Sequence, residues 1–121
     1  MAGGEILIID DDEMILVLAQ SILQEDGFDV ITTADGPHGI EIYKIRRPDL
    51  VLLDLGLPSL DGRIVLANIR EIDPTAKVLI ITGYGSTRTV DEAMKLGALD
   101  VLSKPFSPHM LLDRVRLAVT V

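Results

Sequence analysis

The 121-residue chain contains no cysteine and no tryptophan, and aromatic residues make up only 3% of it. The absence of cysteine excludes disulfides, thiolate metal ligands and cysteine nucleophiles. The scarcity of aromatic rings argues against the base-stacking surfaces of single-stranded nucleic-acid binders. No apolar run approaches the ~18–20 residues that a membrane-spanning helix needs. We therefore expect no membrane insertion and no dependence on disulfides.

Positive charge is missing from the first third of the chain. Residues 1–43 carry ten Asp and Glu but no Lys or Arg, and the formal net charge of the whole chain is −8. Proteins bind nucleic acid largely by neutralising phosphates, so direct nucleic-acid binding is not expected. A secretory signal begins with a basic segment, which is also absent, and we therefore predict a cytoplasmic location.

The length and the 48% hydrophobic content predict one domain with its own core, spanning residues 1–121, with no output domain in this sequence. Continuous apolar runs, rather than alternating ones, are typical of strands buried on both faces of a parallel sheet. Five such runs occur along the chain: Ile6–Ile9, Val30–Thr32, Leu50–Leu53, Val78–Ile81 and Leu99–Leu102.

Amphipathic stretches alternate with these runs, and glycine, proline or serine marks several of their ends. The expected helices are Glu13–Glu25, Pro37–Arg46, Gly62–Ile72, Ser86–Leu96 and Pro108–Val119. Five strands alternating with five helices predict an α/β fold with a doubly wound five-stranded parallel sheet. We favour the strand order 2-1-3-4-5, although periodicity alone does not determine it.

The polar residues that follow the strands are the candidate functional residues, because ligands of open α/β sheets bind outside the carboxyl ends of the strands. The first strand is followed by three aspartates, the third by one aspartate, the fourth by a hydroxyl and the fifth by a lysine: Asp10, Asp11, Asp12, Asp54, Thr82 and Lys104. In the expected topology these side chains meet at one edge of the sheet.

Asp54 is the most informative of these residues, because it ends the strand expected to be central and buried, where an uncompensated carboxylate is costly. Bringing it near Asp10 and Asp11 adds repulsion of about 1–4 kcal/mol per pair at 4 Å. A divalent cation would offset this repulsion, and an all-oxygen ligand set favours Mg²⁺ or Mn²⁺. A simpler explanation of the acidic run is that acids stabilise the start of the first helix.

Lys104 and Thr82 complete the predicted site. Taken alone, Lys104 could serve only as an ion-pair partner for the acids, and Thr82 only as a strand-end cap. Together with a metal beside Asp54, they suit transfer of a phosphoryl group onto that carboxylate. Lys104 and the metal would offset the charge on the phosphoryl oxygens, and Thr82 would donate a hydrogen bond.

Four motifs in this order resemble the receiver domain of two-component response regulators over essentially the full chain. They are Ile6-Leu7-Ile8-Ile9-Asp10-Asp11-Asp12, Leu52-Leu53-Asp54-Leu55-Gly56-Leu57-Pro58 with Asp61-Gly62, Ile80-Ile81-Thr82-Gly83, and Gly97-Ala98 leading to Lys104-Pro105-Phe106. The resemblance implies a flavodoxin-like receiver fold and a phosphorylation-controlled signalling module. A receiver is not an enzyme in the usual sense, beyond catalysing its own phosphorylation and dephosphorylation.

The resemblance also implies a metal site and its ligands. Asp11 is expected to bind Mg²⁺ or Mn²⁺ directly, and Asp10 largely through water. The Asp54 carboxylate and the backbone carbonyl of Gly56 are expected to complete the protein ligands, while Asp12 faces solvent at the helix start.

The same resemblance assigns the remaining roles. Asp54 is expected to be the phosphoacceptor, Thr82 the switch hydroxyl and Lys104 the phosphate-binding lysine. The expected phosphoryl donor is the phosphohistidine of a histidine kinase or phosphotransfer protein, and a second copy of this chain, forming a homodimer, is a further candidate partner. The Lys104–Pro105 bond is expected to be cis.

Three positions depart from the family pattern or modify its behaviour. Many receivers carry Tyr or Phe three residues before the lysine as a conformational switch, whereas this chain has Val101. Tyr84 and Gly56 lie at positions that tune phosphoryl lifetime in the family. We therefore predict that the signal passes mainly through residues 83–87 and the start of the fourth helix.

Three other functions deserve comparison. A haloacid-dehalogenase-like phosphohydrolase also uses an aspartyl nucleophile, but it needs a second acid two residues later, where this chain has Gly56. Asp10 and Asp12 form the Asp-x-Asp of topoisomerase-primase enzymes, although there the motif lies on a later strand. A receiver that binds partners without phosphorylation is disfavoured because Asp54, Thr82 and Lys104 are all present.

Overall fold

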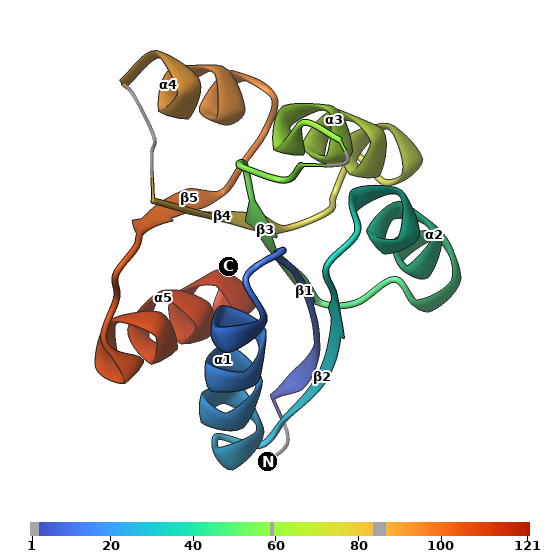
Figure 1. The fold of residues 1–121 in the computed structure, drawn as a ribbon. Coiled ribbons are helices and arrows are strands. Elements are labelled where there is room, and N and C mark those ends of the chain that lie inside the picture. The colour runs from blue at the N-terminus through green and yellow to red at the C-terminus, as the bar shows by residue number, and fades with distance from the viewer. Residues whose placement is uncertain (1–2, 59, 84–86) are drawn as a thin grey trace.

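The computed structural model describes residues 3–58, 60–83 and 87–121. Strands and helices alternate through the whole chain (Figure 1). In order, the elements are β1 (Gly4–Ile9), α1 (Glu13–Glu25), β2 (Phe28–Thr33), α2 (Gly36–Arg46), β3 (Leu50–Asp54), α3 (Gly62–Ile72), β4 (Val78–Thr82), α4 (Thr87–Lys95), β5 (Asp100–Ser103) and α5 (Pro108–Thr120).

The five strands form one parallel sheet in the order β2-β1-β3-β4-β5, which confirms the predicted strand order. Helices α1 and α5 cover one face of the sheet, and α2, α3 and α4 cover the other (Figure 1). Side chains of β3 alternate between the two cores. Val51 and Leu53 pack under α2, α3 and α4, whereas Leu50 and Leu52 pack under α1 and α5. The central strand is therefore buried on both faces, as its unbroken apolar run predicts.

Side-chain caps define where several helices begin. Asp12 caps α1 by accepting a hydrogen bond from the Met14 amide at 3.0 Å, and its exposed side chain faces solvent as predicted. Asp35, Asp61 and Ser107 cap α2, α3 and α5 in the same way. Among the described helices, none is long and apolar enough to cross a membrane.

The observed boundaries differ from the predicted ones by a few residues at most. β2 is longer than the predicted Val30–Thr32, because it pairs with β1 along its whole length from Phe28 to Thr33. β5 begins at Asp100 rather than Leu99 and ends at Ser103. The predicted start of the fourth helix, Ser86, lies outside the described residues.

Candidate functional site

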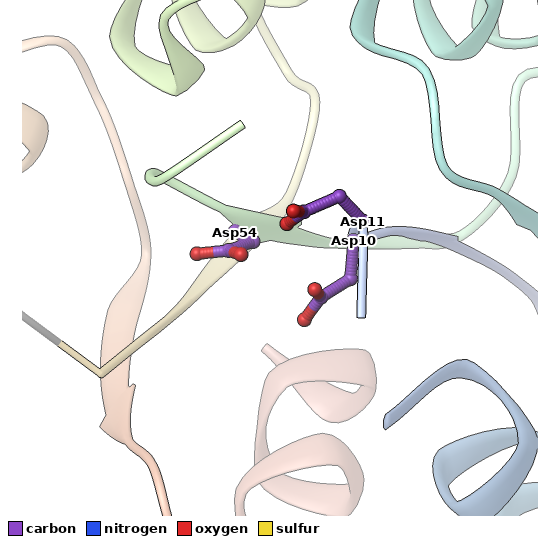
Figure 2. Close-up of side chains that lie close together, drawn as sticks. All are labelled: Asp10, Asp11 and Asp54. Atoms are coloured by element: carbon purple, nitrogen blue, oxygen red, sulfur yellow. The ribbon is translucent and has the colours of Figure 1, made fainter. Parts of the chain in front are cut away.

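The carboxyl ends of β1 and β3 lie side by side at one edge of the sheet. Ile9 is paired with Leu53, so the residues that follow them, Asp10 and Asp54, are neighbours. With Asp11 they place one carboxylate oxygen each within 4.8 Å of one another. Figure 2 shows the three carboxylates gathered where the two strands end. The structure thus brings together the three acids that the sequence predicted to meet.

Asp10 is the most deeply buried of the three, with no exposed surface. Burial raises the pKa of its carboxyl from 3.8 to about 6, and the neighbouring Asp54 charge acts in the same direction. The Asp12 amide, which donates to Asp10 Oδ1 at 2.9 Å, and the Lys104 ammonium oppose this rise only in part. Ionised Asp10 is therefore under-compensated by the protein alone.

Asp54 is held by two donors at the end of the central strand. Its side chain is almost fully buried, at 6% exposure. The Gly56 amide donates to Oδ1 at 3.0 Å, and the Lys104 ammonium donates to Oδ2 at 3.3 Å. The start of α3 also lies against this strand end. A Cβ on Gly62 would lie 2.6 Å from the Asp54 carbonyl oxygen, so only glycine fits there without a shift.

Lys104 reaches the acids from the other side of β4. Its amide donates to the Thr82 carbonyl at 2.8 Å, and the Lys104–Pro105 bond is cis, as predicted. The Lys104 ammonium lies 2.8 Å from Asp10 Oδ2 and 3.3 Å from Asp54 Oδ2. Burial alone would lower the pKa of Lys104, but its close contact with Asp10 and the charges of both acids raise it overall. The lysine therefore stays cationic between two carboxylates.

A cavity of about 330 Å³ opens beside Asp54. Thr82, which is nearly buried, lines it together with Gly56 and Asp11. The cavity wall also includes Asp12, Leu55 and Thr89. A group attached to the Asp54 carboxylate would therefore be surrounded by the hydroxyl, the glycine and an exposed acid that the sequence singled out.

The acid cluster suits a hard divalent cation, because its possible ligand atoms are carboxylate oxygens. Three carboxylates face one ammonium, and all donors of the cluster are oxygens, which favours Mg²⁺ or Mn²⁺ over softer metals. Within the described residues, Asp10 Oδ2 is the one buried side-chain oxygen without a hydrogen bond of good geometry, despite the nearby ammonium. Such an oxygen is available to a cation or to the water that a cation binds.

Comparison with known proteins agrees with this geometry. The sequence model of a protein family, the response regulator receiver domain, matches residues 6–116 of this chain. The chain belongs to this family. Receiver domains are signalling domains rather than enzymes in the usual sense, which agrees with the expectation from the sequence.

Similar proteins cover nearly the whole receiver domain. Sporulation initiation phosphotransferase F of Bacillus subtilis is 36% identical over 116 residues, covering 96% of this chain and 94% of its own length. A CheY-like receiver structure from Methanospirillum hungatei superposes with a TM-score of 0.93 at 29% identity, covering 96% and 93%. A CheX–CheY–BeF₃–Mg²⁺ complex from Borrelia burgdorferi matches with a TM-score of 0.91 at 33% identity, covering 97% and 89%.

Besides Gly56, which lies at the site, two positions bear on the predicted signal route, namely Val101 and Tyr84. Val101, which replaces the frequent aromatic residue, is half-buried on β5 and packs against the core beneath α4. Tyr84 and most of the predicted signal route through residues 83–87 lie outside the described residues. The structure therefore leaves the proposed route through this loop as a prediction.

The sequence missed one residue of the cavity wall on α4, namely Thr89. It follows Thr82 by seven residues, so no strand-end rule points to it. Its position depends on how α4 is seated on the sheet, which apolar periodicity does not determine.

Proposed function

We propose that this receiver domain, spanning residues 1–121, accepts a phosphoryl group on Asp54 from a phosphohistidine of a histidine kinase or phosphotransfer protein. The observation that carries the proposal is the position of the Asp54 carboxylate. It lies at the end of the central strand, within 3.3 Å of the Lys104 ammonium, in contact range of two further acids and beside a cavity.

The transfer is a displacement at phosphorus. A carboxylate oxygen of Asp54 forms a bond to phosphorus while the bond from phosphorus to the imidazole nitrogen of the donor breaks, and the electron pair stays on that nitrogen. The hydrogen bond from the Gly56 amide holds Asp54 Oδ1, so the carboxylate is oriented before the donor arrives.

The surrounding side chains offset the charge that the phosphoryl group adds. Lys104 already touches Asp54 and can contact a phosphoryl oxygen with little movement, and the Thr82 hydroxyl lines the same cavity. Mg²⁺ or Mn²⁺, held by Asp10, Asp11, Asp54 and the Gly56 carbonyl, would supply further positive charge at the phosphoryl oxygens.

Phosphorylation then changes the surface to which partners bind. A charge-assisted hydrogen bond draws the Thr82 hydroxyl toward the phosphoryl group, and the loop after β4 and the start of α4 follow it. The partners of this receiver domain are therefore a histidine kinase or phosphotransfer protein upstream and a protein or second copy downstream. The net charge of −8 argues against nucleic acid as a direct partner, and the expected location is cytoplasmic.

A small phosphodonor tests the phosphoacceptor. Incubation with acetyl phosphate and Mg²⁺ should add one phosphoryl group to the wild type, measured by intact mass, and none to Asp54→Asn. Labelling of Asp54→Asn equal to that of the wild type would assign the phosphoryl group to another residue.

The same labelling experiment, together with an assay of phosphate release from a phosphomonoester, separates the competing functions. A phosphohydrolase of the haloacid-dehalogenase type would release many equivalents of phosphate from a phosphomonoester, whereas Gly56 leaves no acid to protonate its leaving group. An interaction receiver without phosphorylation would show no mass increase in either protein. Single, Asp54-dependent labelling without phosphomonoester turnover distinguishes the proposed function from both.

A further inference from the structure

Helix α4 has the weakest apolar anchorage over the site. Among the α4 side chains that the structure describes, Ala93 alone is buried, whereas α1, α3 and α5 each bury at least three residues. Alanine buries little apolar surface, so packing contributes less to the position of α4 than to that of its neighbours. Figure 1 shows α4 at the edge of its layer, beside α3. Polar contacts from α3 therefore have more influence on where α4 lies.

Such contacts connect α4 to the chain segment that follows Asp54 and leads into α3. Arg63, in the first turn of α3, pairs with Glu92 of α4 through one guanidinium nitrogen. Its other nitrogens contact Asp61, at 2.7 Å to Oδ2 and 3.2 Å to Oδ1. The hydrogen bond from Arg63 lowers the pKa of the Glu92 carboxyl, so both carboxylates stay ionised near neutral pH. We call the three residues Asp61, Arg63 and Glu92 the α3–α4 clamp.

The clamp and the cavity meet on one helix. Thr89 lies three residues before Glu92, on the same side of α4, and lines the cavity beside Asp54. Moving α4 away from α3 would therefore move a part of the cavity wall. The remaining described wall residues lie at the ends of β1, β3 and β4, which the sheet holds in place.

We propose that the α3–α4 clamp keeps α4 seated over the cavity and thereby lengthens the lifetime of a phosphoryl group on Asp54. The inference rests on the proposed function. Loss of that group is hydrolysis. A water oxygen bonds to phosphorus, the bond between phosphorus and the Asp54 oxygen breaks, and inorganic phosphate leaves while the water's proton passes to phosphate or solvent. Seating of α4 restricts the entry of this water. Arg63 and Glu92 are positioning residues, acting through the wall that contains Thr89.

Dephosphorylation kinetics test the clamp. Wild type, Arg63→Gln, Glu92→Gln and the double variant are phosphorylated with acetyl phosphate and Mg²⁺, freed of donor, and followed by intact mass at a temperature well below unfolding. Each single variant should lose its phosphoryl group about two- to fivefold faster than wild type, the range expected when a partly exposed ion pair is lost. The double variant should be no faster than the singles, because both substitutions break one pair. Either single variant tests the proposal if the other fails to fold.

Arg88→Gln is the matched control. Arg88 also contacts Glu92, at 3.3 Å, but it lies on α4 itself and bridges no helices. Its removal should leave the rate unchanged, and Arg63→Lys should restore most of the lifetime that Arg63→Gln loses. Wild-type rates in both single clamp variants, or equal acceleration by Arg88→Gln, would overturn the clamp while leaving the proposed function intact. A wild type that takes up no phosphoryl group would overturn the proposed function and the clamp with it.

Discussion

Replacing Asp10 by asparagine should stabilise the metal-free protein, although it removes a charged side chain from an ion pair. Asp10 has no exposed surface, and its pKa of about 6 lies well above the 3.8 of an unperturbed aspartate. That rise already includes the favourable contact with Lys104 and corresponds to about 3 kcal/mol against the ionised form at neutral pH. The amide that replaces the carboxylate is buried and would form imperfect hydrogen bonds, which should offset about 1–2 kcal/mol of this 3 kcal/mol gain in stability. Asp10→Asn should therefore gain about 1–2 kcal/mol, or about 4–8 °C in melting temperature.

The gain should depend on pH in a defined direction. Above pH 6, Asp10 is ionised in both the folded and the unfolded chain, and the full penalty of the buried charge is present. As the pH falls from about 6 to below 3.8, Asp10 takes up a proton first in the folded state, and the penalty disappears. The stability gain of Asp10→Asn over wild type should therefore be largest above pH 6 and should shrink as the pH falls. Near pH 3 only the cost of the buried amide remains, so the variant should be about 1–2 kcal/mol less stable than wild type.

Urea denaturation in the presence of EDTA measures this difference from pH 3 upward. Asp29→Asn is the matched control, since it removes the same charge from the acidic first third at an exposed position on β2. It should change stability by less than about 0.5 kcal/mol. The reasoning fails if Asp10→Asn is no more stable than wild type at pH 8, or if this gain does not shrink in acid.

Three further measurements probe the site and its supports. Millimolar Mg²⁺ should raise the melting temperature of the wild type but have a smaller effect on Asp10→Asn, because the cation binds the native acid cluster; equal shifts would argue against a metal site there. Gly97→Ala should cost at least about 1–2 kcal/mol in urea denaturation, because Gly97 has φ 101° and a Cβ would lie 2.6 Å from Arg70 Nε. Tyr43→Phe should cost about 1 kcal/mol, because the buried phenol donates to Asp73 Oδ2 at 3.0 Å; an unchanged midpoint would mean that water replaces this bond at no cost.

Strand-end residues were predictable because two simple rules place them. Unbroken apolar runs mark the buried parallel strands, and all such strands present their carboxyl ends at one edge of the sheet. Asp10, Asp54 and Lys104 could therefore be expected to meet, and they do. The edge strand β2 was underestimated, because its polar Asp29 interrupts the apolar run although its backbone pairs fully with β1.

The position of α4 followed from neither rule. Among the described side chains of α4, one small residue is buried. Such a helix carries little information about its position, since its apolar stripe can pack at several tilts and offsets. The pairing of Arg63 with Glu92 across 29 residues depends on that seating, and so does the appearance of Thr89 in the cavity wall. Long-range ion pairs are set by tertiary geometry and leave no local signature in the sequence.

The weakly packed helix α4 is also the one that a conformational switch can displace at low cost, because elements with few buried contacts open most readily. The residues that sequence rules fail to place on α4 are thus those through which we propose that this helix lengthens the lifetime of a phosphoryl group on Asp54.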